Sequence, residues 1–167
     1  MNIKNITRIA MIAAVYTVVS LALAPLSFGP VQIRIAEALT ILPLIYKPSI
    51  IGVTLGCFLT NLIGAFTGAN PTGFLDAGIG TLATFLAAYG TYYFRHSKVV
   101  SIPLISLLSP IILNFIFIGA ELAYLFMPEN ILLGMMINGF SVALGELASV
   151  ILGYILIKAL EKTKIFA

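Results

Sequence analysis

Long apolar stretches follow one another along almost the whole chain, separated only by short clusters of proline, glycine and charged residues. Six such stretches lie at roughly 8–27, 35–46, 49–67, 75–94, 101–127 and 132–157. A helix needs roughly 20 apolar residues to cross the hydrocarbon of a bilayer, and all but the second stretch have about that length. The pattern predicts an all-α integral membrane protein with six transmembrane helices in a single domain, residues 1–167.

The second stretch, 35–46, is too short to cross a bilayer upright. The segment before it, Ser27-Phe28-Gly29-Pro30-Val31-Gln32, has the composition of irregular backbone. Such backbone is tolerated at membrane depth only where protein or a water-filled cavity satisfies its polar groups. We therefore expect this region to belong to a binding site.

The composition agrees with a bilayer as the solvent of this chain. Of the 167 residues, 60% are hydrophobic and 9% are charged, and the mean hydropathy is +1.12. A soluble domain carries about 25% charged residues. The length leaves no room for a soluble catalytic or nucleotide-binding domain beside the spans. The cations are scattered singly, which argues against a nucleic-acid partner.

The sequence offers little material for an enzyme. It holds one cysteine, Cys57, and one histidine, His96, so neither a disulfide nor a metal cluster of the usual ligands is expected. It contains no HExxH motif, no nucleophile elbow and no GxxxxGK[ST] phosphate loop. We predict that the protein is not an enzyme and holds no cofactor, and that any ATP hydrolysis belongs to a partner.

The cations indicate an orientation. Eight of the nine fall at one end of the predicted spans, and Arg34 is the exception: Lys4, Arg8, Lys47, Arg95, Lys98, Lys158, Lys162 and Lys164. The positive-inside rule makes that end cytoplasmic. We predict a multi-pass protein of the cell membrane with both termini inside and the first stretch retained as a helix.

Three acids lie within the apolar stretches: Glu37, Glu121 and Glu146. Each ionised side chain would cost about 3 kcal/mol at the centre of a span. They are therefore expected to face the interior of the bundle or a cavity.

Further polar residues are predicted to share the outer half of the membrane with these acids. They are Gln32, Arg34, Asn61, Asp76, Asn114 and Asn138. Together they suggest a cup that is open to the outside and closed below. The alternatives are that Arg34 reaches toward lipid headgroups, that Asp76 caps its helix, and that Asn114 and Asn138 make plain hydrogen bonds between helices.

Small residues at four-residue spacing predict close helix packing. The sets are Gly52 with Gly56, Gly64 with Gly68, and Gly145 with Ser149 and Gly153. Ala10 and Ala14 repeat the spacing in the first stretch, where they serve either packing within the bundle or docking of a partner helix.

Several segments resemble the QueT family, substrate-specific S components of energy-coupling factor importers for queuosine precursors. They are Ser27–Pro43 with its SFGPVQIRIAEALTILP sequence, then GCFLTNL at 56–62, GTLAT at 80–84, ELAY at 121–124 and ALGE at 143–146. The resemblance implies a six-helix bundle that pairs with a transmembrane coupling subunit and two cytoplasmic ATPases. It also implies that the face of Ala10 and Ala14 contacts the coupling subunit.

The resemblance implies a queuosine-related solute, namely preQ0, preQ1, queuine or queuosine. A 7-deazaguanine presents two adjacent donors that one carboxylate can accept, while an amide or Arg34 can donate to its carbonyl. We assign the carboxylate role to Glu121 or Glu37. An aminomethyl group would need a second acid, Asp76 or Glu146, and the ring could stack on an aromatic side chain: Phe58, Phe74 or Tyr124.

Other functions stay open at this point. A proton-coupled secondary carrier could use Glu121 and Glu146 as a proton relay. An S component for another vitamin would share the fold, since one fold hosts many solutes. A membrane enzyme lacks the required residues, and a purely structural protein would not require acids in a cup.

Overall fold

The chain is helical in the computed structural model, which describes residues 2–29, 32–99 and 101–163. Pro30, Val31 and Lys164, which the sequence analysis used, lie outside these ranges. In the part of the chain that is described, the only extended pairing is an isolated bridge between Val99 and Ile102. The prediction of an all-helical protein is thereby confirmed.

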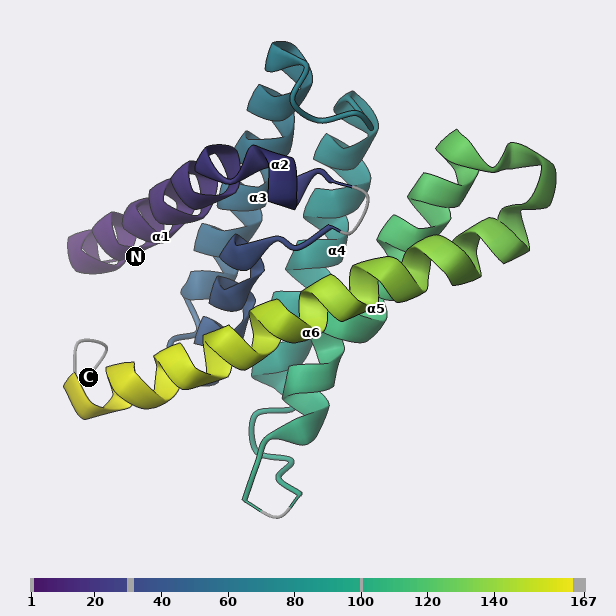
Figure 1. The fold of residues 1–167 in the computed structure, drawn as a ribbon. Coiled ribbons are helices and arrows are strands. Elements are labelled where there is room, and N and C mark those ends of the chain that lie inside the picture. The colour runs from purple at the N-terminus through teal and green to yellow at the C-terminus, as the bar shows by residue number, and fades with distance from the viewer. Residues whose placement is uncertain (1, 30–31, 100, 164–167) are drawn as a thin grey trace.

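Eight helical elements follow one another along the described chain (Figure 1). They are α1 (Ile3–Ala22), α2 (Ala24–Ser27), η1 (Ile35–Leu44), α3 (Ser49–Thr67), α4 (Phe74–Tyr93), α5 (Leu104–Phe126), η2 (Pro128–Asn130) and α6 (Ile131–Thr163). Each predicted stretch contains one long element. The first helix is interrupted at Leu23, just before Pro25, whose ring cannot donate the hydrogen bond that a continuous helix needs.

Four of the described segments are long and apolar enough to cross a membrane: α1, α3, α5 and the η2–α6 segment at Pro128–Thr163. Helix α4 has 20 residues, but Asp76 and its threonines and tyrosines lower its hydropathy. Element η1 has only 10 residues, as the sequence analysis expected. The protein is thus a multi-pass helical membrane protein, while length and composition support four of the six predicted spans.

Element η1 lies at the centre of the bundle, where it contacts α1, α3, α4, α5 and α6. It is a 3-10 helix, and seven of its 10 residues are buried. Two local features favour this winding: Pro43 has no N–H, and the Thr40 hydroxyl donates to the Glu37 carbonyl at 2.6 Å. Because a 3-10 helix has three residues per turn, Arg34, Glu37 and Thr40 share one face.

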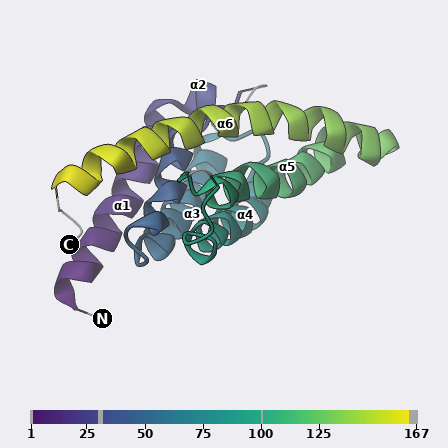
Figure 2. The same cartoon turned by 90° about the horizontal axis from the view of Figure 1, so that it is seen from below.

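Helix α6 crosses the bundle (Figure 2). Its small residues pack against η1 and the residues before it. A Cβ at Gly145 would lie 2.2 Å from the Gln32 carbonyl oxygen, and one at Gly153 would lie 2.3 Å from that of Ala38. Between them, the Ser149 hydroxyl donates to the Arg34 carbonyl at 2.9 Å. The predicted packing role of this series is confirmed, and its partner is the backbone of η1 and the residues before it.

Helix α3 packs on α1 through a second predicted pair. A Cβ at Gly52 would lie 2.9 Å from the Ile12 side chain, and one at Gly56 would lie 2.7 Å from that of Tyr16. This close approach lets the backbones of α1 and α3 meet. It also buries Tyr16 completely.

The third predicted pair does not act as a pair. A Cβ at Gly64 would meet the side chains of Asn70 and Phe28, but Gly68 ends α3 in the left-handed conformation with φ 73° and meets nothing. Its role is that of a C-terminal cap, which glycine fills without strain. On α1, Ala10 and Ala14 are exposed and do not pack within the bundle.

Candidate functional site

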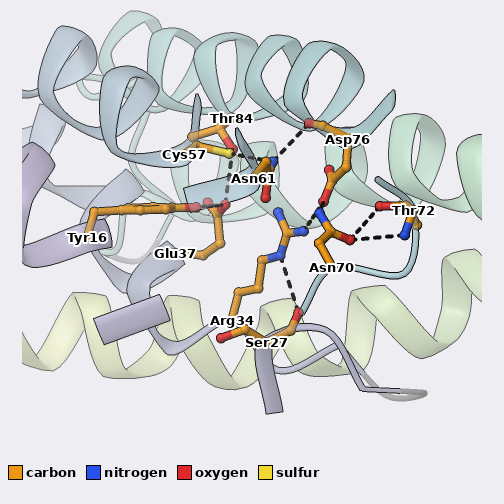
Figure 3. A network of polar contacts seen from close by, with 10 residues as sticks. All are labelled: Tyr16, Ser27, Arg34, Glu37, Cys57, Asn61, Asn70, Thr72, Asp76 and Thr84. Carbon is orange, nitrogen blue, oxygen red and sulfur yellow. Dashed lines mark hydrogen bonds and ion pairs between the residues drawn. The ribbon is translucent and has the colours of Figure 1, made fainter. Parts of the chain in front are cut away.

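A buried ion pair joins the start of η1 to the first turn of α4 (Figure 3). Arg34 Nη2 donates to Asp76 Oδ2, and the two side chains are 8% and 2% exposed. The same oxygen accepts from Asn70 Nδ2 at 3.0 Å. Charge-assisted bonds of this kind are stronger than neutral ones. Arg34 therefore points into the protein and does not extend to lipid headgroups.

The loop between α3 and α4 positions Asp76. Asn61 Nδ2 donates to the Asp76 carbonyl at 2.9 Å, and the N-cap of α4 is Gly73, so Asp76 is not the capping residue. The Asn70 side-chain oxygen accepts from the Thr72 backbone N–H at 3.1 Å and from its hydroxyl at 2.7 Å. These bonds hold the loop against the carboxylate.

Glu37 connects η1 to α1 and α4. Its Oε1 accepts hydrogen bonds from the Tyr16 hydroxyl and from the Thr84 hydroxyl, the latter at 3.0 Å. The Thr84 hydroxyl also lies 3.2 Å from the sulfur of Cys57. Glu37 is 1% exposed, and its second oxygen has no partner in the described ranges. One carboxylate oxygen is thus tied to the scaffold and the other is available.

Helices α5 and α6 contribute polar groups that the protein leaves unpaired. Asn114, Glu121 and Glu146 are all buried. Among the described residues, the Asn114 amide nitrogen, both oxygens of Glu121 and Oε1 of Glu146 have no hydrogen bond. Thr72 lies beside Glu121 and Asn114 beside Glu146, but in neither case is the bond geometry good. A buried polar group without a hydrogen bond lowers the stability of the fold unless a water molecule or a ligand bonds to it.

Two adjoining spaces lie beside this network, and Glu121 lines neither of them. The inner one is a polar cavity of about 10 Å³, close to the least volume that holds one water molecule. It is lined by Gln32, Arg34, Glu37, Asn114, Ile118, Val142 and Glu146. A bicyclic solute would therefore have to displace the surrounding helices to enter it.

The second space is a pocket of about 300 Å³. It is lined by Phe28, Gly29, Gln32, Pro71, Leu122, Phe126 and Asn138. Gln32 borders both spaces and therefore marks their boundary. A volume of this size is at the lower end for pockets that bind small molecules.

The structure brings most of the predicted site residues together. Arg34 lies within electrostatic range of Glu37, Asp76, Glu121 and Glu146. Gln32, Asn114 and Asn138 line the two spaces, and Asn61 supports Asp76. In the described chain, no group of three or more His, Cys, Asp or Glu side chains could hold a metal ion.

The predicted aromatic residues do not join this cluster. Phe58, Phe74 and Tyr124 are 40%, 58% and 64% exposed. Phe74 packs edge-on against Phe66, with ring centroids 5.1 Å apart, and Tyr124 borders a mainly apolar surface groove between α4 and α5, which Glu121 also lines. Helices that are apolar on every side give no periodicity from which to choose the inward face, and here these rings point outward.

The residues of the site that were not predicted include Tyr16, Phe28, Asn70, Thr72 and Thr84. Tyr16 could have been found from the polar group that it forms with Thr17 and Ser20 in the second, mainly apolar half of α1. Phe28 lies within the irregular segment, and its ring faces the Arg34 guanidinium at 5.4 Å. The other three carry no signal in one sequence, since polar loop and helix residues are common.

Comparisons with known proteins support one family. The model of the QueT transporter family matches residues 6–162. A curated relative, a queuosine precursor transporter QueT of Lactococcus lactis subsp. cremoris (strain MG1363), is 33% identical over 84 residues. That match covers 49% of this chain and 46% of the relative, less than half of its length. No solved structure matches.

The family match runs over nearly all of the chain and includes every segment that carried the resemblance. The family is one of transporters and not of enzymes. The expected resemblance is therefore confirmed, and the chain belongs to the QueT transporter family.

Proposed function

We propose that this chain is the solute-binding S component of an ATP-driven energy-coupling factor importer. It captures a queuosine-related 7-deazaguanine from outside the cell and delivers it by toppling against a coupling subunit. The name of the Lactococcus relative, a queuosine precursor transporter, supports the solute class. In this proposal residues 1–167 form one six-span domain with both termini in the cytoplasm.

The charge balance of the cluster is the observation that carries the proposal. Arg34 is the only Lys or Arg among its described residues, and it lies within electrostatic range of four acids. It already pairs with Asp76, so the remaining acids have no ion-pair partner in the described part of the chain. A buried site with excess carboxylate favours a ligand that brings N–H donors or positive charge. A deazaguanine with an aminomethyl group brings both.

The geometry supports a definite division of roles, in which Glu121 and Glu146 exchange the roles assigned from the sequence. Glu146 and Asn114 lie side by side in the polar cavity. A carboxylate there can accept from N1–H and the exocyclic amine of the base, while the adjacent amide donates to the carbonyl. Glu121 has both oxygens free and is left to receive the aminomethyl cation. The network of Glu37 and Asp76 then serves as the scaffold.

The partners in this proposal are a transmembrane coupling subunit and two cytoplasmic ATPases. Ala10 and Ala14 are exposed on α1, which suits a flat docking face for a partner helix. The opposite face of α1 places Tyr16 on Glu37. A hydrogen bond thus connects the docking helix to the solute site.

Calorimetric titration of the purified protein tests the solute and the roles together. The wild type should bind 7-aminomethyl-7-deazaguanine more tightly than 7-cyano-7-deazaguanine, because the cyano compound lacks the cation. Glu146→Gln should weaken both by about tenfold or more, since a charge-assisted bond contributes about 1.5–3 kcal/mol. Glu121→Gln should weaken only the aminomethyl compound.

Glu161→Gln is the matched control, because Glu161 is a partly exposed acid at the far end of α6. It should leave both affinities unchanged. Unchanged affinity in Glu121→Gln and Glu146→Gln would refute the assigned roles. Failure of the wild type to bind any deazaguanine would refute the proposed solute.

A proton-coupled carrier is the second candidate, because the unpaired oxygens of Glu121 and Glu146 could carry protons. Uptake would then persist in cells that lack the ATPase partners and would collapse with a protonophore. Uptake that needs the ATPases and resists the protonophore supports the importer instead.

A further inference from the structure

A pocket of about 220 Å³ lies at the opposite end of the bundle from the solute site. The end of η1, the connection between α4 and α5, and the last turns of α6 meet there. Its polar lining consists of Arg95, His96, Lys98, Ser101, Lys158 and Glu161. None of these residues belongs to the buried network of the solute site.

The pocket carries an excess of positive charge. Lys158 is paired with Glu161 at 3.1 Å, but Arg95 and Lys98 form no ion pair within the described part of the chain. Arg95 uses one N–H for the Tyr92 carbonyl at 2.9 Å and stacks on the Tyr92 ring at 3.9 Å. This arrangement fixes the guanidinium and leaves its other donors free. The pocket therefore suits an anion.

The connection between α4 and α5 is shaped to add a neutral donor. Ser101 has φ 68°, in the left-handed region that a serine rarely adopts. Paired backbone bonds between Val99 and Ile102, at 2.9 and 3.0 Å, close the tight loop around it. Backbone strain of this kind costs about 1–3 kcal/mol and is found most often at binding sites. Here it presents Ser101 to the pocket beside Lys98.

The remaining wall of the pocket is apolar. It is lined by Leu44, Ile45, Pro103, Ile157 and the Tyr154 ring, over which the Lys158 ammonium lies. Ile151 and Ile155 are exposed on the outer face of the same helix α6, at 52% and 61%. A free phosphate compound would gain nothing from these side chains. A phospholipid would place its phosphate among the cations and its acyl chains along the apolar surface. Basic pockets at the ends of membrane helices are known to hold anionic headgroups.

We propose that this pocket binds the phosphate of an anionic phospholipid. The site is independent of the solute and of the transport mechanism. It would anchor the α4–α5 connection, the end of η1 and the end of α6 to one leaflet.

Native mass spectrometry of the purified full chain tests the proposal with phosphatidylglycerol and phosphatidylcholine as probes. The wild type should retain phosphatidylglycerol at least about fivefold more than phosphatidylcholine, in keeping with about 1 kcal/mol per cation at a membrane surface. The double variant Lys98→Gln/Lys158→Gln should lose this preference. The matched control Lys4→Gln/Lys162→Gln removes the same charge outside the pocket and should keep it.

Inorganic phosphate in the millimolar range distinguishes the two sources of the phosphate group. It should not displace phosphatidylglycerol if the apolar wall contributes. Displacement by inorganic phosphate, equal retention of both lipids by the wild type, or equal loss in the control pair would each overturn the proposal. Retained preference in Lys98→Gln/Lys158→Gln would also overturn it and would favour an acidic partner protein as the occupant. Solute affinity, measured in parallel, should be unchanged in all variants.

Discussion

The two sides of the solute site differ in how fully the protein satisfies its own polar groups. On the side of η1, α3 and α4, one oxygen of each acid accepts two hydrogen bonds, Asp76 Oδ2 from Arg34 and Asn70, and Glu37 Oε1 from Tyr16 and Thr84. The second oxygen of each has no partner in the described chain. On the side of α5 and α6, Asn114 Nδ2 and both oxygens of Glu121 have no partner within the described ranges.

We interpret the side of η1, α3 and α4 as the scaffold of the site and the side of α5 and α6 as its ligand-binding surface. Bonds that the protein makes to itself stabilise the fold and hold η1 in place. Polar groups that are buried without hydrogen bonds destabilise the folded protein, and a ligand that forms hydrogen bonds with them offsets this loss. Substitutions on the first side should therefore reduce stability, and substitutions on the second side should reduce affinity.

The largest effect is expected from breaking the ion pair. Arg34→Met leaves Asp76 buried without its cation and should lower the free energy of unfolding by about 3–5 kcal/mol. Thermal unfolding in detergent measures this loss. The double variant Arg34→Met/Asp76→Leu should regain part of the stability, because it removes both charges, but it should not regain solute binding. An unchanged melting temperature in Arg34→Met would contradict the scaffold role.

A smaller effect is expected where α6 is packed onto the segment that carries the scaffold. Gly145→Ala places a Cβ 2.2 Å from the Gln32 carbonyl oxygen and should cost about 1–3 kcal/mol through overpacking. It should also weaken solute binding, because Gln32 borders both spaces of the site. Gly78→Ala is the control, since a Cβ there meets nothing within 4 Å. Equal stability and equal solute affinity of the two variants would show that the close contact between Gly145 and the Gln32 carbonyl is not required.

Two Glu-to-Gln substitutions separate the sides of the site most directly. Glu37→Gln weakens the bonds from Tyr16 and Thr84 and should lower stability by about 1 kcal/mol. Glu146→Gln removes a buried carboxylate whose Oε1 is unpaired and should leave stability in the absence of ligand unchanged or raised. Chemical unfolding of both variants without solute measures the difference. A larger loss of stability in Glu146→Gln than in Glu37→Gln would contradict the assignment of Glu37 to the scaffold and of Glu146 to the ligand-binding side.

The smallest effect concerns the aromatic residues. Phe28→Leu removes the ring that faces the Arg34 guanidinium and lines the 300 Å³ pocket, and it should weaken solute binding about two- to fivefold. Phe58→Leu changes a ring that is 40% exposed on α3 and should have no effect. Calorimetric titration of both variants with the same deazaguanine measures the two affinities. A loss of affinity in Phe58→Leu alone would restore the stacking role first assigned to it.

Much of the fold could be predicted because proline, glycine and charged residues interrupt the apolar stretches so regularly. The range 49–67 predicted for α3 agrees with Ser49–Thr67. The end of α6 was missed: the helix continues to Thr163, past the predicted end at 157, since the Lys158–Glu161 pair prolongs the helix beyond the apolar run. The 3-10 winding of η1 was also missed, because it depends on contacts from five surrounding helices.

The candidate site was predictable as a set of residue types but not as a set of contacts. The cost of burying charge was enough to direct Glu37, Glu121 and Glu146 inward. It could not identify Asp76 as the partner of Arg34, 42 residues away, nor Tyr16 as the donor to Glu37. Those pairings depend on the position of η1 in the bundle. That position depends on the close contacts that Gly145 and Gly153 allow between α6 and the backbone of Gln32 and Ala38.

The three-residue turn of η1 also gives this family a rule for comparing its members. Positions 34, 37 and 40 share one face, from which Arg34 and Glu37 line the polar cavity, whereas an α-helix would spread the same three over about a third of a turn. Substitutions at every third position of this segment should therefore occur together with changes in the scaffold residues that they contact, such as Asp76, Tyr16 and Thr84. Substitutions at the positions between them should follow only the volume of the side chains that the neighbouring helices pack against them.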